Sequence, residues 1–527
     1  MKFLTPTRHL LAFGLSLVAT VTIANAQYTN GQPANILWGQ GVFTTGAAAA
    51  PPNVGTFKAP TDFAIDPATG KFYLADTGNN RVLRFSSASA YNYGAGAEAV
   101  FGQKDFTTSA AGAPVSSSTM TAPAGVVVDS LGTLWVADTG NNRVIGFKSA
   151  ATTLSGNGTS APATLIFGQI DFLGSAPNTT QSGMRSPTGV TIDGNGSLYV
   201  VDQGNNRVLK FTNPYVLGDG ITAINADSQL GQTNYLVGTA GTTNSTLKTP
   251  TLAKVDSSGN LWVSDTGNNR ILFFASVATQ PVGGAATKVI GQTDFVTGTP
   301  GTTQTTLSGP TGISFDDLNR LYVSDTTNNR VLIYNADALS LSNSGASASF
   351  VLGQTLFTTF TAGTTQTALS APFAITYSNQ QLWVVDKSNN RVINFTLTPG
   401  TPSFIAPGRV KVNTTKKKRV FTYTFQGSNA SDSYTLRASV PSSASKLAKV
   451  TFLYNGMDVT SSLKAGTFST GIFGPGELTF TVQVKPQGDT VQTDGGKFAI
   501  TLTAVSETNS SYSAQQAITI KLLKAKN

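Results

Sequence analysis

Ala75-Asp76-Thr77-Gly78-Asn79-Asn80-Arg81-Val82-Leu83-Arg84-Phe85 decides the fold, because this stretch returns five more times along the chain. The further copies occupy residues 137–147, 201–211, 264–274, 324–334 and 385–395. Their aspartates follow one another at intervals of 60–64 residues. Regular repetition of a strand-like unit at such a period predicts a propeller or a solenoid.

Two more elements recur with the same period. One is a Gly-Gln pair between apolar residues, first found in residues 36–43 and again at 101–106, 167–172, 230–235, 290–295 and 352–357. The other is a proline followed by an apolar run, which begins at Pro60, Pro123, Pro187, Pro250, Pro310 and Pro372. Together these elements predict four short antiparallel strands per period, joined by turn residues. The strands are apolar at successive positions, so both of their faces should be covered.

The order of these elements predicts how the ring closes. The first Gly-Gln strand precedes the first proline unit, and no Gly-Gln strand follows Phe395. We therefore expect the strand near Trp38 to supply the missing outer strand of the sixth sheet. Closure by strands from both ends of the repeat region would leave no open edge.

The repeat carries a resemblance to a known family. Pro-x-Gly-(Val/Ile), followed by Leu-(Tyr/Trp)-Val-x-Asp-x-x-Asn-Asn-Arg-(Val/Ile)-x-x-Phe, resembles the NHL repeat over about residues 36–395. The resemblance implies an all-β, six-bladed β-propeller. It does not imply one function, since the family includes sensor domains, RNA-binding modules, lyases and gluconolactonase-like hydrolases. Function must then be read from the site and not from the fold.

Residue usage excludes several kinds of chemistry. The sequence contains no cysteine, and its single histidine is His9, within the first 26 residues. Catalysis by Ser-His-Asp and histidine-ligated zinc are therefore excluded for a chain that begins after them. The zinc-dependent lyases among the family's relatives would need such histidines. A metal site would have to use oxygen ligands, which favours calcium or magnesium.

Residues 1–26 have the pattern of a secretory signal. Lys2 and Arg8 precede an apolar run, and Ala24-Asn25-Ala26 fits cleavage before Gln27. An N-terminal anchor helix is the alternative, although the run is short for spanning a bilayer. We expect a secreted protein that is extracellular, periplasmic or associated with the cell surface, with no transmembrane segment in the mature chain.

The chain is expected to contain two domains after the signal. Residues 27–400 should form the propeller, and residues 401–527, with five alternating apolar runs, a small antiparallel β-sandwich that resembles immunoglobulin-like modules. Residues 401–527 hold 15 Lys and Arg against 6 Asp and Glu, whereas residues 27–400 hold 18 against 20. The propeller therefore lacks the cationic field of a nucleic-acid-binding surface, and we expect no nucleic acid partner.

The charged residues of the repeat are interpreted as structural. Their sixfold repetition argues for architecture, because a single site needs asymmetry. The carboxylates can accept turn N–H groups, and the arginines can bridge neighbouring turns or sheets. The residues assigned to these turns are Asp76, Arg81, Asp138, Arg143, Asp202, Arg207, Asp265, Arg270, Asp325, Arg330, Asp386 and Arg391.

Departures from the repeat mark the candidate ligand site. Asp62 replaces the glycine of the family's pattern in unit one, and Lys254 stands in unit four where the other units have uncharged residues, namely Ala64, Val127, Thr191, Ser314 and Thr376. Units one and four would face each other across a six-membered ring, so the pair predicts a polar ligand in the central channel. A structural ion pair that plugs the channel is the alternative. Phe373 is a candidate stacking surface, with core packing as its alternative.

Two surfaces are candidates for partners. The loops from each Gly-Gln strand to the next proline are rich in Thr, Ser, Gly and Ala, and should lie on one face of the ring. Their sparse charge suits a protein or carbohydrate partner. The run Lys416-Lys417-Lys418-Arg419 could hold an anionic envelope polymer, or it could be a solvated face that protects an edge strand.

These observations favour an exported, non-catalytic binding or scaffold protein that uses the propeller loop face. No catalytic residue and no cofactor are expected under this hypothesis. The alternative is a gluconolactonase-like hydrolase or lyase with an oxygen-ligated calcium in the channel. Asp62 is the one acidic departure that the sequence places there.

Overall fold

The computed structural model describes residues 28–86, 96–153, 155–156, 158–217, 223–341, 344–379, 381–396, 403–407, 409–413, 418–426, 433–470, 477–487, 496–507 and 513–523. The predicted signal, residues 1–26, lies outside them. Contacts between Cα atoms divide the chain into two compact units. One spans Tyr28–Leu397, and the other includes Thr398–Asn527.

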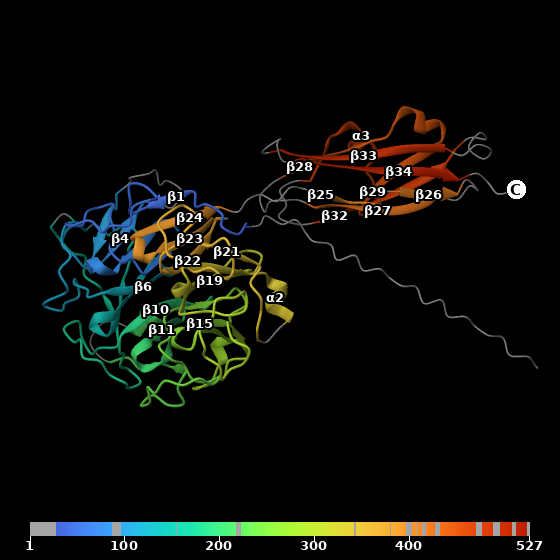
Figure 1. Cartoon of the computed structure of the whole chain (residues 1–527). Helices are drawn as coiled ribbons and strands as arrows, with labels where there is room; N and C mark the ends of the chain where they lie inside the picture. The colour runs from blue at the N-terminus through green and yellow to red at the C-terminus, as the bar shows by residue number, and fades with distance from the viewer. Residues whose placement is uncertain are drawn as a thin grey trace, which may run out of the picture. The chain divides into compact units, whose positions relative to one another are not determined.

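The first unit consists of six four-stranded antiparallel sheets arranged around a centre (Figure 1). Sheet 1 contains β2 (Asp62–Ile65), β3 (Phe72–Asp76), β4 (Arg81–Phe85) and β5 (Ala99–Phe101), and sheet 2 contains β6 (Pro123–Val128), β7 (Leu134–Asp138), β8 (Arg143–Phe147) and β9 (Leu165–Phe167). Sheet 3 contains β10 (Pro187–Ile192), β11 (Leu198–Asp202), β12 (Arg207–Phe211) and β13 (Ser228–Leu230). The predicted all-β class and the four strands per period are confirmed.

The remaining three sheets follow the same plan. Sheet 4 contains β14 (Ala253–Val255), β15 (Leu261–Asp265), β16 (Arg270–Phe274) and β17 (Lys288–Ile290). Sheet 5 contains β18 (Pro310–Phe315), β19 (Leu321–Asp325), β20 (Arg330–Tyr334) and β21 (Phe350–Leu352). Sheet 6 contains β22 (Pro372–Ser378), β23 (Gln381–Asp386), β24 (Arg391–Thr396) and, at its outer edge, β1 (Ile36–Trp38). Short helices α1 (Pro214–Leu217) and α2 (Ala336–Leu341) follow β12 and β20.

The six sheets form a closed ring. The inner strands contact one another in the order β2, β6, β10, β14, β18 and β22, and β22 returns to β2. Strand β1 pairs antiparallel with β24, and Leu37 lies opposite Ile393. The predicted six-bladed propeller and its closure by the N-terminal strand are therefore confirmed. In a six-membered ring this order also places β2 directly across from β14.

Each repeat turn is a short 3-10 helix that ends in a left-handed asparagine. In sheet 2 this helix is η2 (Thr139–Asn141), and Asn142 follows it at φ 54° and ψ 44°. Asparagine tolerates this conformation better than most side chains, which explains its place in all six turns. The equivalent helices are η1 (Thr77–Asn79), η3 (Gln203–Asn205), η4 (Thr266–Asn268), η6 (Thr326–Asn328) and η7 (Lys387–Asn389). One further 3-10 helix of this unit, η5 (Val277–Thr279), follows β16.

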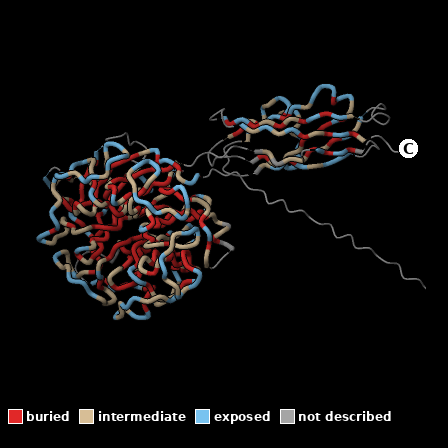
Figure 2. The backbone as a smooth tube through the Cα atoms, in the orientation of Figure 1, coloured by how far each residue is buried: buried red, intermediate tan, exposed pale blue. Residues whose placement is uncertain are grey.

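Apolar side chains between neighbouring sheets form the core, which appears as the red interior of the propeller in Figure 2. Strands β3 and β4 are buried at every position. This agrees with their continuous apolar sequence, because both faces of a stacked sheet are covered. Within the described residues, none of the helices is long and apolar enough to span a bilayer.

The second unit contains two five-stranded sheets, seen as two layers in Figure 1. Their buried side chains, including Phe425, Phe452, Ile500 and Ile518, share one hydrophobic core. One sheet has the order β25 (Ser403–Ile405), β27 (Arg419–Gln426), β32 (Glu477–Pro486), β29 (Ala448–Tyr454) and β30 (Met457–Asp458). The other has the order β26 (Arg409–Asn413), β34 (Ser513–Leu523), β33 (Gly496–Ser506), β28 (Tyr434–Ser439) and β31 (Phe468–Ser469).

The second of these sheets is mixed, because β26 pairs with β34 in the parallel sense. The expectation of a wholly antiparallel sandwich is therefore wrong. The physical reason is that the chain leaves β25 in one sheet, crosses to the other for β26 and then returns for β27. Helices η8 (Ser442–Lys446) and α3 (Thr460–Ala465) lie between strands of this unit. The resemblance to immunoglobulin-like modules stays a prediction.

Candidate functional sites

The repeated Asp and Arg residues form buried ion pairs within each sheet. In sheet 2, Arg143 Nε donates to Asp138 Oδ2 at 2.7 Å, and both side chains are fully buried. Asn141 Nδ2 donates to the same oxygen, and the Thr121 N–H donates to Asp138 Oδ1. Burial raises the pKa of this carboxyl, whereas the Arg143 guanidinium and the donors lower it. The same pair recurs in the other sheets between Asp76 and Arg81, Asp202 and Arg207, Asp265 and Arg270, Asp325 and Arg330, and Asp386 and Arg391.

Each arginine also holds two interblade loops in place. Arg143 Nη2 donates to the carbonyls of Ser116 and Thr119 in the loop that enters its sheet. Its Nη1 donates to the Phe172 carbonyl in the loop that leaves that sheet. The six loops therefore lie on the same face of the ring as the Asp-x-x-Asn-Asn turns. We call this side the loop face and the opposite side, where inner strands turn into the next strand, the hairpin face.

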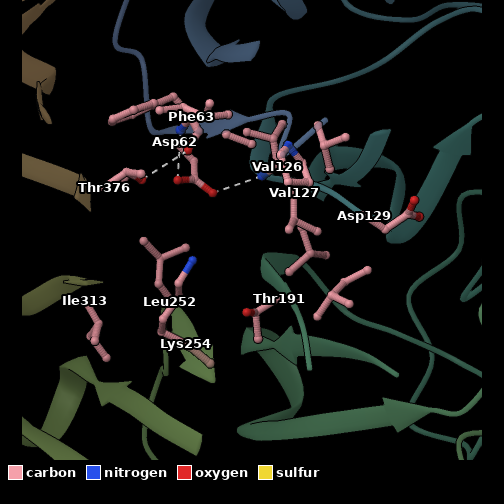
Figure 3. Close-up of a pocket in the computed structure, with 18 of the residues that line it drawn as sticks. Asp62, Phe63, Val126, Val127, Asp129, Thr191, Leu252, Lys254, Ile313 and Thr376 are labelled. Carbon is pink, nitrogen blue, oxygen red and sulfur yellow. Dashed lines mark hydrogen bonds between the residues drawn. The ribbon is translucent and has the colours of Figure 1, made fainter. Parts of the chain in front are cut away.

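The central channel contains a cavity of about 500 Å³ that reaches the hairpin face. Inner strands of all six sheets line it, together with hairpin residues such as Ser130 and Gly194. Asp62 and Lys254 both belong to its wall, and Figure 3 shows the two side chains pointing into it from opposite sides. Asp62 and Lys254, the two residues predicted from the sequence to reach the channel, therefore line the same cavity.

Asp62 is held by backbone donors. Its Oδ1 accepts the Phe63 N–H at 2.8 Å, and its Oδ2 accepts the Val126 N–H of the next sheet at 2.9 Å (Figure 3). Burial raises the pKa of the Asp62 carboxyl to about 7, against the lowering effect of these donors and of Lys254. The carboxyl therefore links sheets 1 and 2, and it exchanges its proton near neutral pH.

Lys254 provides the opposite charge. Burial lowers the pKa of its ammonium, and the charge of Asp62 raises it. Among the ion pairs of the described residues, none joins Asp62 to Lys254. The two groups thus share a cavity without neutralising each other by direct contact. A ligand with a donor at one end and an acceptor at the other can contact both.

Phe373 does not belong to this cavity. It is half-buried, packs against the core between sheets 1 and 6, and lies 4.4 Å from Lys387 Nζ, measured from the ring centroid. Lys387 occupies the first position of η7, at the loop-face end of the ring. Instead, Tyr377 lines the cavity and stacks on Tyr322 at 6.0 Å and 13°. Sequence reasoning missed Tyr377, although it is the one tyrosine among the six equivalent positions.

The described acidic side chains that line the cavity do not gather into a cluster that could hold a metal ion. The described residues contain no group of three or more acidic side chains arranged to hold a metal ion. Two other carboxylates that line the cavity are hydrogen-bonded within their own sheets. Asp129 accepts a hydrogen bond from Trp135 Nε1, and Asp193 accepts one from the Tyr199 hydroxyl. Calcium takes six to eight oxygen ligands, commonly with several carboxylates among them, and the described cavity does not bring three carboxylates together.

The loop face carries an asymmetric set of exposed aliphatic side chains. Leu173, Leu236 and Val296 are 74%, 77% and 71% exposed. They occupy one repeat position in three successive units, directly after the aromatic residue that follows Gly-Gln, where the other units have threonine. We call these three residues the aliphatic arc. Sequence reasoning missed the arc, but comparison of that position among the six copies would have found it.

Each member of the arc is fixed by its neighbours. The Leu173 N–H donates to Asp171 Oδ1 at 2.8 Å, and the carbonyl of the preceding Phe172 accepts from Arg143. The Val296 N–H likewise donates to Asp294 Oδ1, and the preceding carbonyl accepts from Arg270. Because the backbone is held on both sides, these apolar side chains face water in an ordered position.

The fold and these sites define a six-bladed propeller with a polar channel cavity and a structured loop face. A family model of the Teneurin NHL domain matches residues 58–332, which is more than half of the chain, and the chain belongs to this family. A comparison with curated proteins gave no significant match.

Solved structures similar to this chain include a streptogramin B lyase, with 13% identity and a TM-score of 0.37 over 69% of this chain and 86% of that one. A protein of unknown function from Bacteroides thetaiotaomicron has 14% identity and a TM-score of 0.41 over 67% and 75%. Hydrazine synthase from Kuenenia stuttgartiensis has 11% identity and a TM-score of 0.38 over 65% and 97%. The activities in these names belong to those proteins.

Proposed function

We propose that this protein is an exported, non-catalytic binding or scaffold protein whose propeller binds a protein partner through the loop face. The observation that carries the proposal is the aliphatic arc. Exposed aliphatic groups on an ordered backbone gain free energy when a partner removes them from water. Little conformational entropy is lost on binding, because the loops are already held by buried arginines.

A protein is the preferred partner over a glycan. Aliphatic side chains pack against the apolar core of a protein interface, whereas sugar rings stack on exposed aromatic faces. The arc itself contains no aromatic residue, and the loop face has one exposed phenylalanine among its described residues, Phe360, which is 60% exposed. A glycan partner is therefore the competing outcome of the test.

Substitution of the arc tests this proposal. Protein partners are captured from the culture medium and envelope of the source organism, and each is then purified for affinity measurements. The triple variant Leu173→Ser, Leu236→Ser, Val296→Thr should bind its partner at least tenfold more weakly. The control is Leu131→Ser, which changes a side chain that is 67% exposed in the hairpin after β6. Equal binding by wild type and triple variant, or binding of glycans alone, would reject the proposal.

The channel cavity supports a second binding role. Asp62 and Lys254, which form no direct ion pair with each other, favour a small polar ligand that carries both a donor and an acceptor, such as a zwitterion. A thermal-shift screen of amino acids, peptides and sugar acids should find ligands whose effect disappears in the double variant Asp62→Asn, Lys254→Met. Unchanged shifts in that variant would discard the site.

The enzymatic alternative, a hydrolase or lyase with channel calcium, lacks the support of a carboxylate cluster in the described cavity. Calcium titration followed by calorimetry tests it directly.

The basic second unit is proposed to hold the protein to an anionic envelope polymer. Of the predicted run, Lys416 and Lys417 lie outside the described residues, whereas Lys418 and Arg419 are exposed. Export is tested by mass spectrometry of the mature N-terminus, expected at Gln27.

A further inference from the structure

The second unit carries two rows of lysines on its outer faces. On one sheet, Lys411 of β26 pairs with Lys521 of β34, and Lys521 pairs with Lys497 of β33. We call these three residues row A. All three are exposed, and they alternate with buried residues such as Val412, Phe498 and Leu522, so they share one face.

The other sheet repeats the arrangement. Lys485 of β32 pairs with Lys449 of β29. Lys418 directly precedes β27, in which Arg419 pairs with Val484, so the same register places Lys418 opposite Lys485. Lys418, Lys485 and Lys449 are all exposed, and we call them row B.

Both rows lie at the same end of this unit. Gly496, next to Lys497, approaches Leu447 near the start of β29 so closely that an added Cβ would lie 3.1 Å from Leu447 Cδ1. The described carboxylates Asp458 and Glu507 lie beyond the other ends of β29 and β33. Positive charge is thus concentrated at one end of the unit.

Folding does not account for these rows. Like charges directly opposite each other on neighbouring strands are destabilising. Lysine protects exposed sheet edges from pairing with other chains. However, Lys521 of β34 is paired on both sides, and Lys485 of β32 lies between β27 and β29, so neither stands at an edge. Lys497 lies beyond Thr501, where the pairing of β28 with β33 ends. Edge protection therefore does not account for Lys521 and Lys485, which favours a role outside folding for them.

We propose that rows A and B bind a linear anionic polysaccharide that carries carboxylate or sulfate groups. Neighbouring strands lie about 4.8 Å apart, so each row presents ammonium groups at steps close to one sugar unit. Hydroxyl and amide side chains flank the rows, such as Thr519 beside row A and Gln483 beside row B. Neither row contains an aromatic ring on which nucleic acid bases would stack.

This inference rests on the proposed polymer-holding role of the second unit, and it does not depend on the loop-face partner. The full-length protein is tested for binding to polygalacturonate, dextran sulfate, neutral dextran and single-stranded DNA at several salt concentrations. Wild type should bind one or both anionic polysaccharides, with affinity that falls as salt rises, and should not bind neutral dextran.

Variants that each remove three positive charges show whether polysaccharide binding depends on the rows or only on the net charge of the protein. The row A variant is Lys411→Gln, Lys497→Gln, Lys521→Gln, and the row B variant is Lys418→Gln, Lys449→Gln, Lys485→Gln. The control changes three exposed cations outside the rows, Lys148→Gln, Arg437→Gln and Lys464→Gln. At least one row variant should bind the polysaccharide tenfold or more weakly, with an equal or higher melting temperature, while the control stays within twofold.

Three results would overturn the inference. They are the absence of polysaccharide binding by wild type, an equal loss in row and control variants, and binding of DNA as tight as that of either polysaccharide. Loop-face partner binding is measured on the same variants. Because the arc is unchanged in them, loss of polysaccharide binding with retained partner binding distinguishes this inference from the propeller's function.

Discussion

Trp38 of β1 packs against Trp383 of β23 with ring centroids 4.9 Å apart, although the two residues come from opposite ends of the propeller sequence. Trp38 also meets Phe72 of sheet 1 edge-on at 4.3 Å, and it is fully buried. One side chain of the closing strand therefore joins the last sheet to the first.

Trp38→Ala is expected to destabilise the propeller by about 3–5 kcal/mol, because it removes a large buried aromatic group and opens a cavity at the closure. The matched control is Val42→Ala, at a side chain that is 53% exposed in the same segment and should change stability by about 0.5 kcal/mol or less. Scanning calorimetry reports the propeller transition. Similar melting of the two variants would contradict a closure that depends on Trp38.

Asp202→Asn should lower the free energy of unfolding of the propeller by about 3–5 kcal/mol, because it leaves the Arg207 guanidinium buried without its charge partner. Glu98→Gln is the comparison, since Glu98 pairs with Lys71 and Arg84 but its side chain is 32% exposed. Because water still reaches the Glu98 carboxylate, its pairs should contribute less to stability than the fully buried pair, about 0–1 kcal/mol. Equal effects in denaturant unfolding would show that the repeated pairs do not support the fold.

Asp62 should give the propeller a distinctive pH dependence. Its pKa lies near 7 in the folded chain and near the ordinary 3.8 in the unfolded chain, so the folded chain binds more protons between these values. The free energy of unfolding should therefore fall as pH rises from 4 to 7. Asp62→Asn should remove about 1–2 kcal/mol of this dependence, which is less than the full shift implies because the side chain is partly exposed at the wall of the cavity, where solvent screens its charge.

Lys254→Met provides an independent check on the same cavity. The Lys254 ammonium lowers the pKa of Asp62, so its removal should move that pKa upward. Carbon NMR of the Asp62 carboxyl measures the shift. An unchanged or lower pKa would show that the two side chains do not sense each other across the channel.

The left-handed asparagines should tolerate glycine better than alanine. Asn142 has φ 54°, donates to the Ser175 carbonyl and accepts the Ser186 N–H. Asn142→Gly loses the two hydrogen bonds, whereas Asn142→Ala also forces a Cβ into a left-handed backbone, at a further cost of about 1–2 kcal/mol. Denaturant unfolding of the two variants measures the difference. Equal stabilities would show that the backbone angle is not the constraint.

The repeat predicted the architecture because each copy carries the residues that shape its own sheet and turn. Asp76 and its five equivalents mark the turns, and the position of Trp38 before the first proline unit predicted ring closure. Asp62 and Lys254 were found because they break the repeat at positions near the ring centre. Phe373 also breaks the repeat, but its side chain lies toward the other end of the ring, which only the path of β22 reveals.

Other features depended on relationships that a single stretch does not show. Leu173 alone does not indicate a binding surface. It does so only when the repeat aligns it with Leu236 and Val296 and the structure shows that all three side chains are exposed. The lysine rows require strand register, since Lys411 and Lys521 are far apart in sequence and adjacent only in the sheet. The parallel pairing of β26 with β34 likewise follows from a crossover of the chain between the two sheets. The alternation of apolar and polar residues along a strand does not indicate such a crossover.

The pairing of β1 with β24 also has a consequence for synthesis. Trp38 leaves the ribosome early, whereas its partner Val392 is added only after five complete sheets have been made. At 5–20 residues per second this interval lasts about 20–70 s. Throughout it, β1 can contact sheet 1 through Trp38 and Phe72 but has no strand to pair with, so its backbone edge stays open until β24 has been made.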